Sequence, residues 1–177
     1  MNEISEGENT IILYFRKSKQ VCIWTVKLAL TCCLPLALQQ KMLKVEHIGI
    51  AVQSLAESLP LFEKLLNTPC YKIEEVESEQ VRTAFFATGV NKIELLESTS
   101  PEGVIARYLA KRGEGIHHIA FEVQDIESEM KRLAGEGFEL LQEKPKRGAD
   151  NKLVCFLHPK GTKNVLVELC QEVEVNK

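Results

Sequence analysis

The segment VEHIGIAVQSLAES, residues 45–58, recurs in related form as IHHIAFEVQDIESE at residues 116–129. Aligning His47 with His118 also pairs isoleucine, valine and glutamine at three further positions and places Ser54 opposite Asp125. Apolar residues alternate at the start of both copies, which is typical of a half-buried strand. Serine and aspartate are favourable helix N-cap residues. The repeat therefore predicts a strand followed by a helix, used twice.

Each predicted helix is followed by short runs that favour strands and are separated by glycine and asparagine. These runs are VRTAFFAT and NKIELLE in the first copy, then LVCFLHP and NVLVELC in the second, at residues 81–88, 91–97, 153–159 and 164–170. The unit is βαβββ, and the two modules span residues 44–97 and 116–171 of one domain at 43–172, with a linker between them. We predict an α+β fold in which two pseudosymmetric modules form a curved mixed sheet around a metal cleft.

A histidine on the first strand and a glutamate on the last strand recur in both modules. The pairs are His47 with Glu94 and His118 with Glu168, at nearly the same separation. A pseudo-twofold axis would bring all four to a shared cleft. Two imidazoles and two carboxylates suit a borderline divalent ion, such as Co, Ni, Mn, Zn or Fe, with one or two positions left for water or substrate. The alternative is that both glutamates simply face solvent on alternating strands.

Other basic residues are assigned from their local context. Because side chains alternate along a strand, we expect His117 on the face opposite His118, in a structural or supporting role. His158 precedes Pro159 at a strand end, which indicates either a turn or a contact with an anionic ligand. A basic loop near Gly148 is either a phosphate contact or solvated surface. The candidate substrate-binding residues are Lys144, Arg147, His158 and Lys160.

Composition excludes several classes of protein. The 177 residues are 45% hydrophobic and 27% charged, which excludes an intrinsically disordered chain. The net charge is -3 and no long basic run is present, so nucleic acid is not expected as a partner. The six cysteines form no CxxC pair, which favours reduced thiols used as small core residues and a reducing compartment.

Residues 1–41 differ from the repeat that follows. Their apolar run VCIWTVKLALTCCLPLAL, residues 21–38, resembles a signal sequence or a membrane anchor. Lys27 in the middle of the run and Pro35 near its end oppose that interpretation. The ordered pattern begins within three residues of Met42. We therefore expect residues 1–41 to be an extension outside the fold and expect no membrane partner.

In the segments HIGIAV, KIELLE, IHHIAFEV, FLHPK and VLVEL, the chain resembles the vicinal oxygen chelate superfamily. This superfamily is also called the glyoxalase/bleomycin resistance/dioxygenase superfamily. Within it, EGIHHIAFEV and KLVCFLHPKGTKNVLVEL most resemble the methylmalonyl-CoA epimerase family. The likeness covers about residues 43–172. It implies metal ligands at His47, Glu94, His118 and Glu168, and a catalytic role for Glu168 in proton transfer.

The resemblance also implies a reaction. It is the epimerisation of (R)- and (S)-methylmalonyl-CoA by proton transfer at C2 through a metal-stabilised enolate. Inversion needs a base on one face and an acid on the other. Some family members carry a second carboxylate at the position that Thr83 occupies here, so the second proton carrier stays open between bound water and another residue.

Further expectations follow from the same resemblance. The implied cofactor is a divalent ion, Co²⁺ first and Mn²⁺, Ni²⁺ or Zn²⁺ as alternatives, and the implied assembly is a homodimer. The expected location is the cytoplasm, or the mitochondrial matrix in a eukaryote. The rival functions are a glyoxalase I-type lyase and a metal-free small-molecule binding protein. A dioxygenase would need only two histidines and one carboxylate, so the fourth ligand argues against it.

Overall fold

The computed structural model of the chain describes residues 11–17, 20–26 and 42–173. Strands β1 (Ile11–Lys17) and β2 (Gln20–Val26) pair antiparallel as a two-stranded sheet of their own. They belong to a different compact unit from the chain that begins at Gln40. Lys27 and Pro35 lie outside the described residues, and the described ranges contain no helix long and apolar enough to span a membrane. The status of residues 1–41 stays a prediction.

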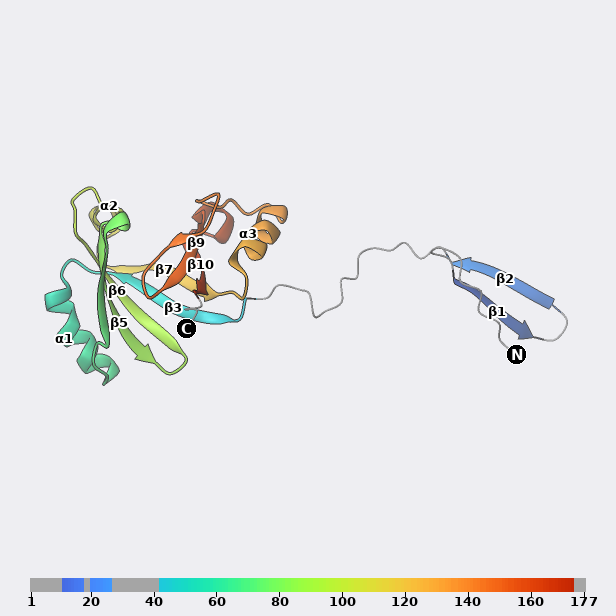
Figure 1. Cartoon of the computed structure of the whole chain (residues 1–177), viewed down its shortest axis with the longest axis horizontal. Coiled ribbons are helices and arrows are strands. Elements are labelled where there is room, and N and C mark those ends of the chain that lie inside the picture. The colour runs from blue at the N-terminus through green and yellow to red at the C-terminus, as the bar shows by residue number, and fades with distance from the viewer. Residues whose placement is uncertain (1–10, 18–19, 27–41, 174–177) are drawn as a thin grey trace. The chain divides into compact units, whose positions relative to one another are not determined.

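The unit that begins at Gln40 is built on one eight-stranded mixed sheet, in the order β4-β5-β6-β3-β7-β10-β9-β8 (Figure 1). Its strands are β3 (Lys44–Ala51), β4 (Lys72–Val76), β5 (Val81–Thr88), β6 (Asn91–Ser98), β7 (Gly115–Glu122), β8 (Lys146–Arg147), β9 (Lys152–Leu157) and β10 (Val167–Glu172). β3 and β7 pair antiparallel in the middle, and each pairs in parallel with the last strand of its own module. The predicted α+β fold with a curved mixed sheet is confirmed.

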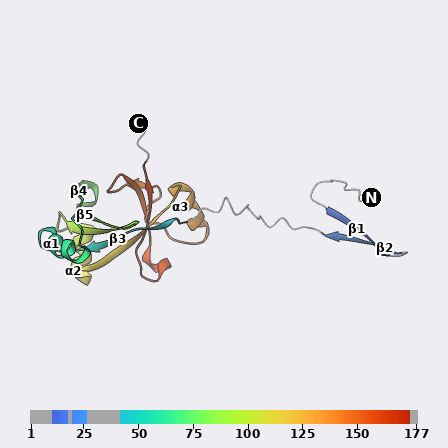
Figure 2. The same ribbon diagram turned by 90° about the horizontal axis from the view of Figure 1, so that it is seen from below.

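The helices begin where the sequence predicts. The Ser54 side chain accepts a hydrogen bond from the Glu57 amide at the start of α1 (Leu55–Leu66), and Asp125 accepts one from Ser128 at the start of α3 (Ile126–Gly135). Each side chain satisfies an amide that has no partner within its helix. In Figure 2, β3 runs through the middle of this unit, with α1 and α3 on either side of it.

The segment between the modules is more ordered than a linker. It contains α2 (Val104–Arg112), which lies between β6 and β7 in the chain. Ile105 of α2 is buried against Ala51, Val81 and Leu96. This packing holds α2 against the first module and supplies apolar surface beside the central strands.

The two outer helices, α1 and α3, cover one face of the sheet, whereas α2 packs against part of the other. Phe86 and Leu95 pack in the cluster that α1 covers, whereas Leu157 and Leu169 pack in the cluster that α3 covers. Because side chains alternate along a strand, the residues next to these four in their strands point to the opposite face. Glu94 is one of these residues, so the alternation that buries the core also directs the predicted ligands into the concave side.

The described cysteines that lie in this unit are Cys70, Cys155 and Cys170, and all three are free thiols. Cys155 and Cys170 are fully buried, and burial raises the pKa of each thiol. They therefore behave as small core residues, as the sequence predicts. The reducing compartment stays a prediction.

Candidate metal centre

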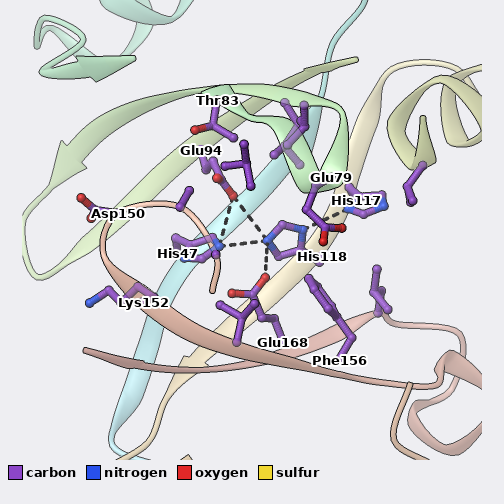
Figure 3. Close-up of a pocket in the computed structure, with 18 of the residues that line it drawn as sticks. His47, Glu79, Thr83, Glu94, His117, His118, Asp150, Lys152, Phe156 and Glu168 are labelled. Carbon is purple, nitrogen blue, oxygen red and sulfur yellow. Dashed lines mark hydrogen bonds and ion pairs between the residues drawn. The ribbon is translucent and has the colours of Figure 1, made fainter. Parts of the chain in front are cut away.

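The four predicted ligands lie together on the four central strands. His47 comes from β3, Glu94 from β6, His118 from β7 and Glu168 from β10, and each is no more than 6% exposed. The two Nε2 atoms of the histidines lie 2.9 Å apart. Glu94 Oε2 lies 3.2 Å from Nε2 of His47 and 3.5 Å from that of His118, and Glu168 Oε2 lies 3.3 Å from the latter. Figure 3 shows the two carboxylates on opposite sides of the histidine pair.

This arrangement fits a divalent cation. Ligand atoms bonded at about 2.1 Å to one ion lie roughly 3 Å from their neighbours, and the contacts above range from 2.9 to 3.5 Å. His47, His118 and Glu168 each offer an atom within 4.8 Å of the other two. Imidazole nitrogen and carboxylate oxygen suit borderline first-row ions. The donor set is therefore compatible with the predicted metal, and the roles of these residues stay a prediction.

The electrostatics of the cluster also favour a cation. Burial lowers the pKa of His47, but hydrogen bonds to Glu46 and Glu94 and the charges of Glu94 and Glu168 outweigh it and raise the pKa to about 10. Burial raises the pKa of Glu94, yet its contacts with His118 and His47 lower it to about 2. Burial raises the pKa of Glu168. The carboxylates thus attract positive charge, which a proton or a metal ion can supply.

The cluster lines a cavity with a volume of about 220 Å³. One wall is apolar and includes Phe85, Leu96 and Ile105, which belong to the first module and α2. The second module contributes both apolar and charged side chains, and the charged ones include Lys146 and Lys152. The cavity is therefore mostly apolar, with the four predicted ligands on its wall and the ammonium groups of two lysines on one side.

The expectation that His117 points to the face opposite His118 is wrong, whereas its expected supporting role stays a prediction. His117 lines the cavity with His118, and the two Nδ1 atoms lie 3.0 Å apart (Figure 3). The pairing of β3 with β7 steps from His118 opposite Gly49 to Ile116 opposite Ile50, so His117 is an extra residue in β7. A β-bulge breaks the strict alternation on which the expectation rested. Burial and the charge of His118 lower the pKa of His117 to about 4.

Glu79 is a cavity residue that sequence reasoning missed. It ends the short 3-10 turn η2 (Glu77–Glu79) and lines the cavity, where Lys146 Nζ lies 2.5 Å from its Oε1. Thr83, which carries no carboxylate, also lines the cavity and is 1% exposed. No motif marks Glu79, because its place depends on how a loop of one module meets a strand of the other. A search for unassigned acidic residues close to Thr83 in sequence would have found it.

The candidate substrate-binding residues are not among those that line the cavity. Lys144, Arg147 and Lys160 are exposed, and Arg147 contacts Asn151. His158 Nδ1 accepts a hydrogen bond from the Lys160 amide and so caps the 3-10 turn η3 (Pro159–Thr162), which is the turn interpretation of this residue. Their roles in substrate binding stay predictions, confined to parts of a ligand outside the cavity.

Comparisons with known proteins agree with the fold. The profile of the Glyoxalase/Bleomycin resistance protein/Dioxygenase superfamily matches residues 46–156. The mitochondrial methylmalonyl-CoA epimerase of Dictyostelium discoideum is 37% identical over 127 residues, which cover 71% of this chain and 76% of that protein. The ethylmalonyl-CoA/methylmalonyl-CoA epimerase of Cereibacter sphaeroides is 35% identical over 130 residues, or 72% of this chain and 97% of that protein.

A solved structure gives the same result. Streptomyces coelicolor methylmalonyl-CoA epimerase, as a variant in complex with 2-nitronate-propionyl-CoA, superimposes with a TM-score of 0.73 and 30% sequence identity. The match covers 76% of this chain and 100% of that one. The likeness therefore extends over the whole unit that carries the cluster.

Proposed function

The chain belongs to the Glyoxalase/Bleomycin resistance protein/Dioxygenase superfamily, and we propose that it catalyses the metal-dependent epimerisation of methylmalonyl-CoA at C2. The observation that carries this function is the convergence of two histidines and two glutamates on the wall of a largely apolar cavity that also holds a further, separate carboxylate. Relatives that are named methylmalonyl-CoA epimerases support the choice of substrate.

The cation would be held by His47, Glu94, His118 and Glu168. When bound, it supplies a Lewis acid that stabilises negative charge on the substrate oxygens as C2 loses its proton. Co²⁺, Mn²⁺, Ni²⁺ and Zn²⁺ all accept mixed nitrogen and oxygen ligands. The resemblance to the epimerase family makes Co²⁺ our first choice among them. The apolar wall excludes water and so strengthens these electrostatic interactions.

Two carboxylates would move the proton. Inversion at one carbon requires removal on one face and delivery on the other. Glu168 lies in the cluster, and burial raises the pKa of its carboxyl, which favours proton uptake. Glu79 reaches the cavity from a different element and contacts Lys146 rather than the histidines. We assign Glu79 as the second acid or base, in place of the missing carboxylate at Thr83.

The charged side of the cavity would orient an anionic substrate. Lys146 and Lys152 both line the cavity, and their ammonium groups can meet a malonyl carboxylate or a phosphate of coenzyme A.

The proposal also includes the assembly and the location of the protein. We propose a homodimer in the cytoplasm or the mitochondrial matrix, with no nucleic-acid or membrane partner.

The test is exchange at C2 in deuterated water. The protein with Co²⁺ is incubated with each epimer of methylmalonyl-CoA, and both deuterium incorporation and inversion are followed, with and without a chelator. We expect inversion and incorporation from both epimers, lost on chelation. No cation-dependent incorporation would refute the function, and turnover of a glutathione hemithioacetal would favour a glyoxalase instead.

The variant Glu79→Gln separates the two proton carriers. We expect inversion to fall by about 10²- to 10⁴-fold, while one epimer still exchanges its C2 proton because the other carboxylate remains. Glu77→Gln is the matched control, since Glu77 lies on the same turn, is exposed and does not line the cavity. Equal inversion rates in both variants would exclude Glu79 as the second carrier.

A further inference from the structure

Glu46, the residue before His47, is a buried carboxylate that the proposed reaction does not use. It is 3% exposed, and its Oε2 lies 2.6 Å from Nδ1 of His47. An ionised carboxylate only accepts hydrogen bonds, so the shared proton belongs to Nδ1. Nε2 of the same ring faces Glu94 and His118 on the other side. The contact therefore selects the tautomer in which Nε2 is free to bind a cation.

A β-bulge brings Glu46 into this position. The pairing of β3 with β7 steps from Val45 opposite Phe121 to His47 opposite Ala120, which leaves Glu46 as an extra residue in β3. In a regular strand the residue before a ligand would point away from it. Bulges redirect side chains in this way and are frequent beside active sites. The local backbone is thus shaped so that two consecutive side chains serve one face.

Two lysines contact Glu46, and one of them also contacts an aspartate. Lys92 Nζ lies 2.6 Å from Glu46 Oε1, and Lys152 Nζ lies 3.5 Å from the same oxygen. Lys92 also contacts Asp150 Oδ2 at 2.6 Å. Lys92 belongs to β6 of the first module, whereas Asp150 lies between β8 and β9 of the second. The orientation of His47 is therefore connected to the contact between the modules.

We propose that Glu46 is a positioning residue for His47, holding the ring in the tautomer and orientation that present Nε2 to a divalent cation. This role rests on the proposed function, because it requires a cation at His47. A carboxylate that accepts a hydrogen bond from a metal-binding histidine raises the basicity of that ligand, and losing it weakens metal binding by about 10- to 100-fold.

The second module provides an internal comparison. His117 is the bulged residue before His118 and contacts its Nδ1, which is the position that Glu46 holds beside His47. A neutral imidazole accepts a hydrogen bond but carries no charge. The loss of His117 is therefore expected to weaken cation binding less than the loss of Glu46, although both residues lie at register shifts between β3 and β7.

The experiment is a titration of the metal-stripped, full-length protein with Co²⁺, followed by calorimetry and by the absorption bands of the bound ion. Glu46→Leu removes both the acceptor and the charge, so we expect an affinity about 100-fold lower and altered bands. Glu46→Gln keeps an acceptor for Nδ1 and is expected to lose only about 10-fold. His117→Phe is expected to lose less than Glu46→Leu.

Glu129→Gln is the matched control. Glu129 is 1% exposed and pairs with Arg132 on α3, so this variant also disrupts a buried carboxylate but touches no predicted ligand. Its Co²⁺ affinity should equal that of the parent protein. If the parent itself binds no Co²⁺, the metal-dependent function is wrong. If the parent binds Co²⁺, two results would show that the role of Glu46 is wrong. In the first, both Glu46 variants have a Co²⁺ affinity within threefold of the parent. In the second, Glu129→Gln loses as much affinity as they do.

Discussion

Gly49 is a residue at which a single added methyl group should strongly weaken cation binding. It lies opposite His118 in the pairing of β3 with β7, and a Cβ atom built on it would fall 2.2 Å from Cε1 of that ring. Real Cβ atoms essentially never approach another heavy atom closer than 3.0 Å. In Gly49→Ala the imidazole must therefore retreat by about 0.8 Å or more, whereas metal–ligand distances tolerate only about 0.2 Å.

The ring has little room to retreat. His118 packs edge-to-face against Phe156 at 5.7 Å and against His117 at 5.3 Å between ring centroids. We expect Gly49→Ala to cost about 1 to 3 kcal/mol of stability through overpacking. Since one ligand would be displaced, Co²⁺ affinity should fall by roughly 100-fold or more, which exceeds the usual effect of losing a supporting contact.

Calorimetric titration of metal-stripped protein with Co²⁺ measures the affinity, and thermal unfolding without metal measures the stability. Gly135→Ala is the control, because nothing lies within 4 Å of its added Cβ and its backbone is not in the left-handed region. It should bind Co²⁺ normally and be more stable by about 0.4 to 1 kcal/mol. A folded Gly49→Ala protein with parental Co²⁺ affinity would refute the steric reasoning.

Two further predictions concern stability. Phe86 is fully buried beneath α1, so Phe86→Ala should lower the free energy of unfolding by about 3 to 5 kcal/mol in a urea titration. A loss below about 1 kcal/mol would show that the core repacks to fill the space left by the phenyl ring. Burial raises the pKa of Asp150, but Lys92 and Lys72 outweigh it and hold the pKa below its usual value. The stabilisation is therefore complete above about pH 4 and lost as pH falls through the lowered pKa. Asp150→Asn should be less stable by on the order of 1 kcal/mol at pH 7, and this deficit should shrink as the pH falls below about 4; a deficit that does not change with pH would contradict this assignment.

The sequence predicted those parts of the fold that depend on local pattern. Ser54 and Asp125 cap their helices as expected because N-capping involves only a few consecutive residues. The pairing of His47 with Glu94, and of His118 with Glu168, was recognisable because duplication repeated each pair with its strand context. The period of 2 in each strand then separated the ligands from the core residues beside them.

What the sequence could not provide depends on contacts between distant segments. The bulges at Glu46 and His117 arise from the register of β3 against β7, and neither strand alone encodes where an extra residue is accommodated. Glu79 meets Lys146 across the two modules, and loop conformation decides that contact. The residues of α2 fall in the predicted linker because they lie outside the repeat. The structure nevertheless buries Ile105 of this helix against the sheet.

The duplicated site is symmetric in its predicted ligands and asymmetric in the residues that contact them. His47 lies opposite Ala120 and His118 lies opposite Gly49, so each histidine faces a small residue of the other module. The symmetry ends one residue earlier in each strand, where a carboxylate supports His47 and an imidazole supports His118. A substrate with a distinct thioester and carboxylate cannot itself be symmetric, and a reaction that treats two faces of one carbon differently needs unlike proton carriers. Under the proposed function, the four predicted ligands are kept to hold one cation, whereas the residues that contact them and the cavity walls differ between the modules because they meet one asymmetric substrate.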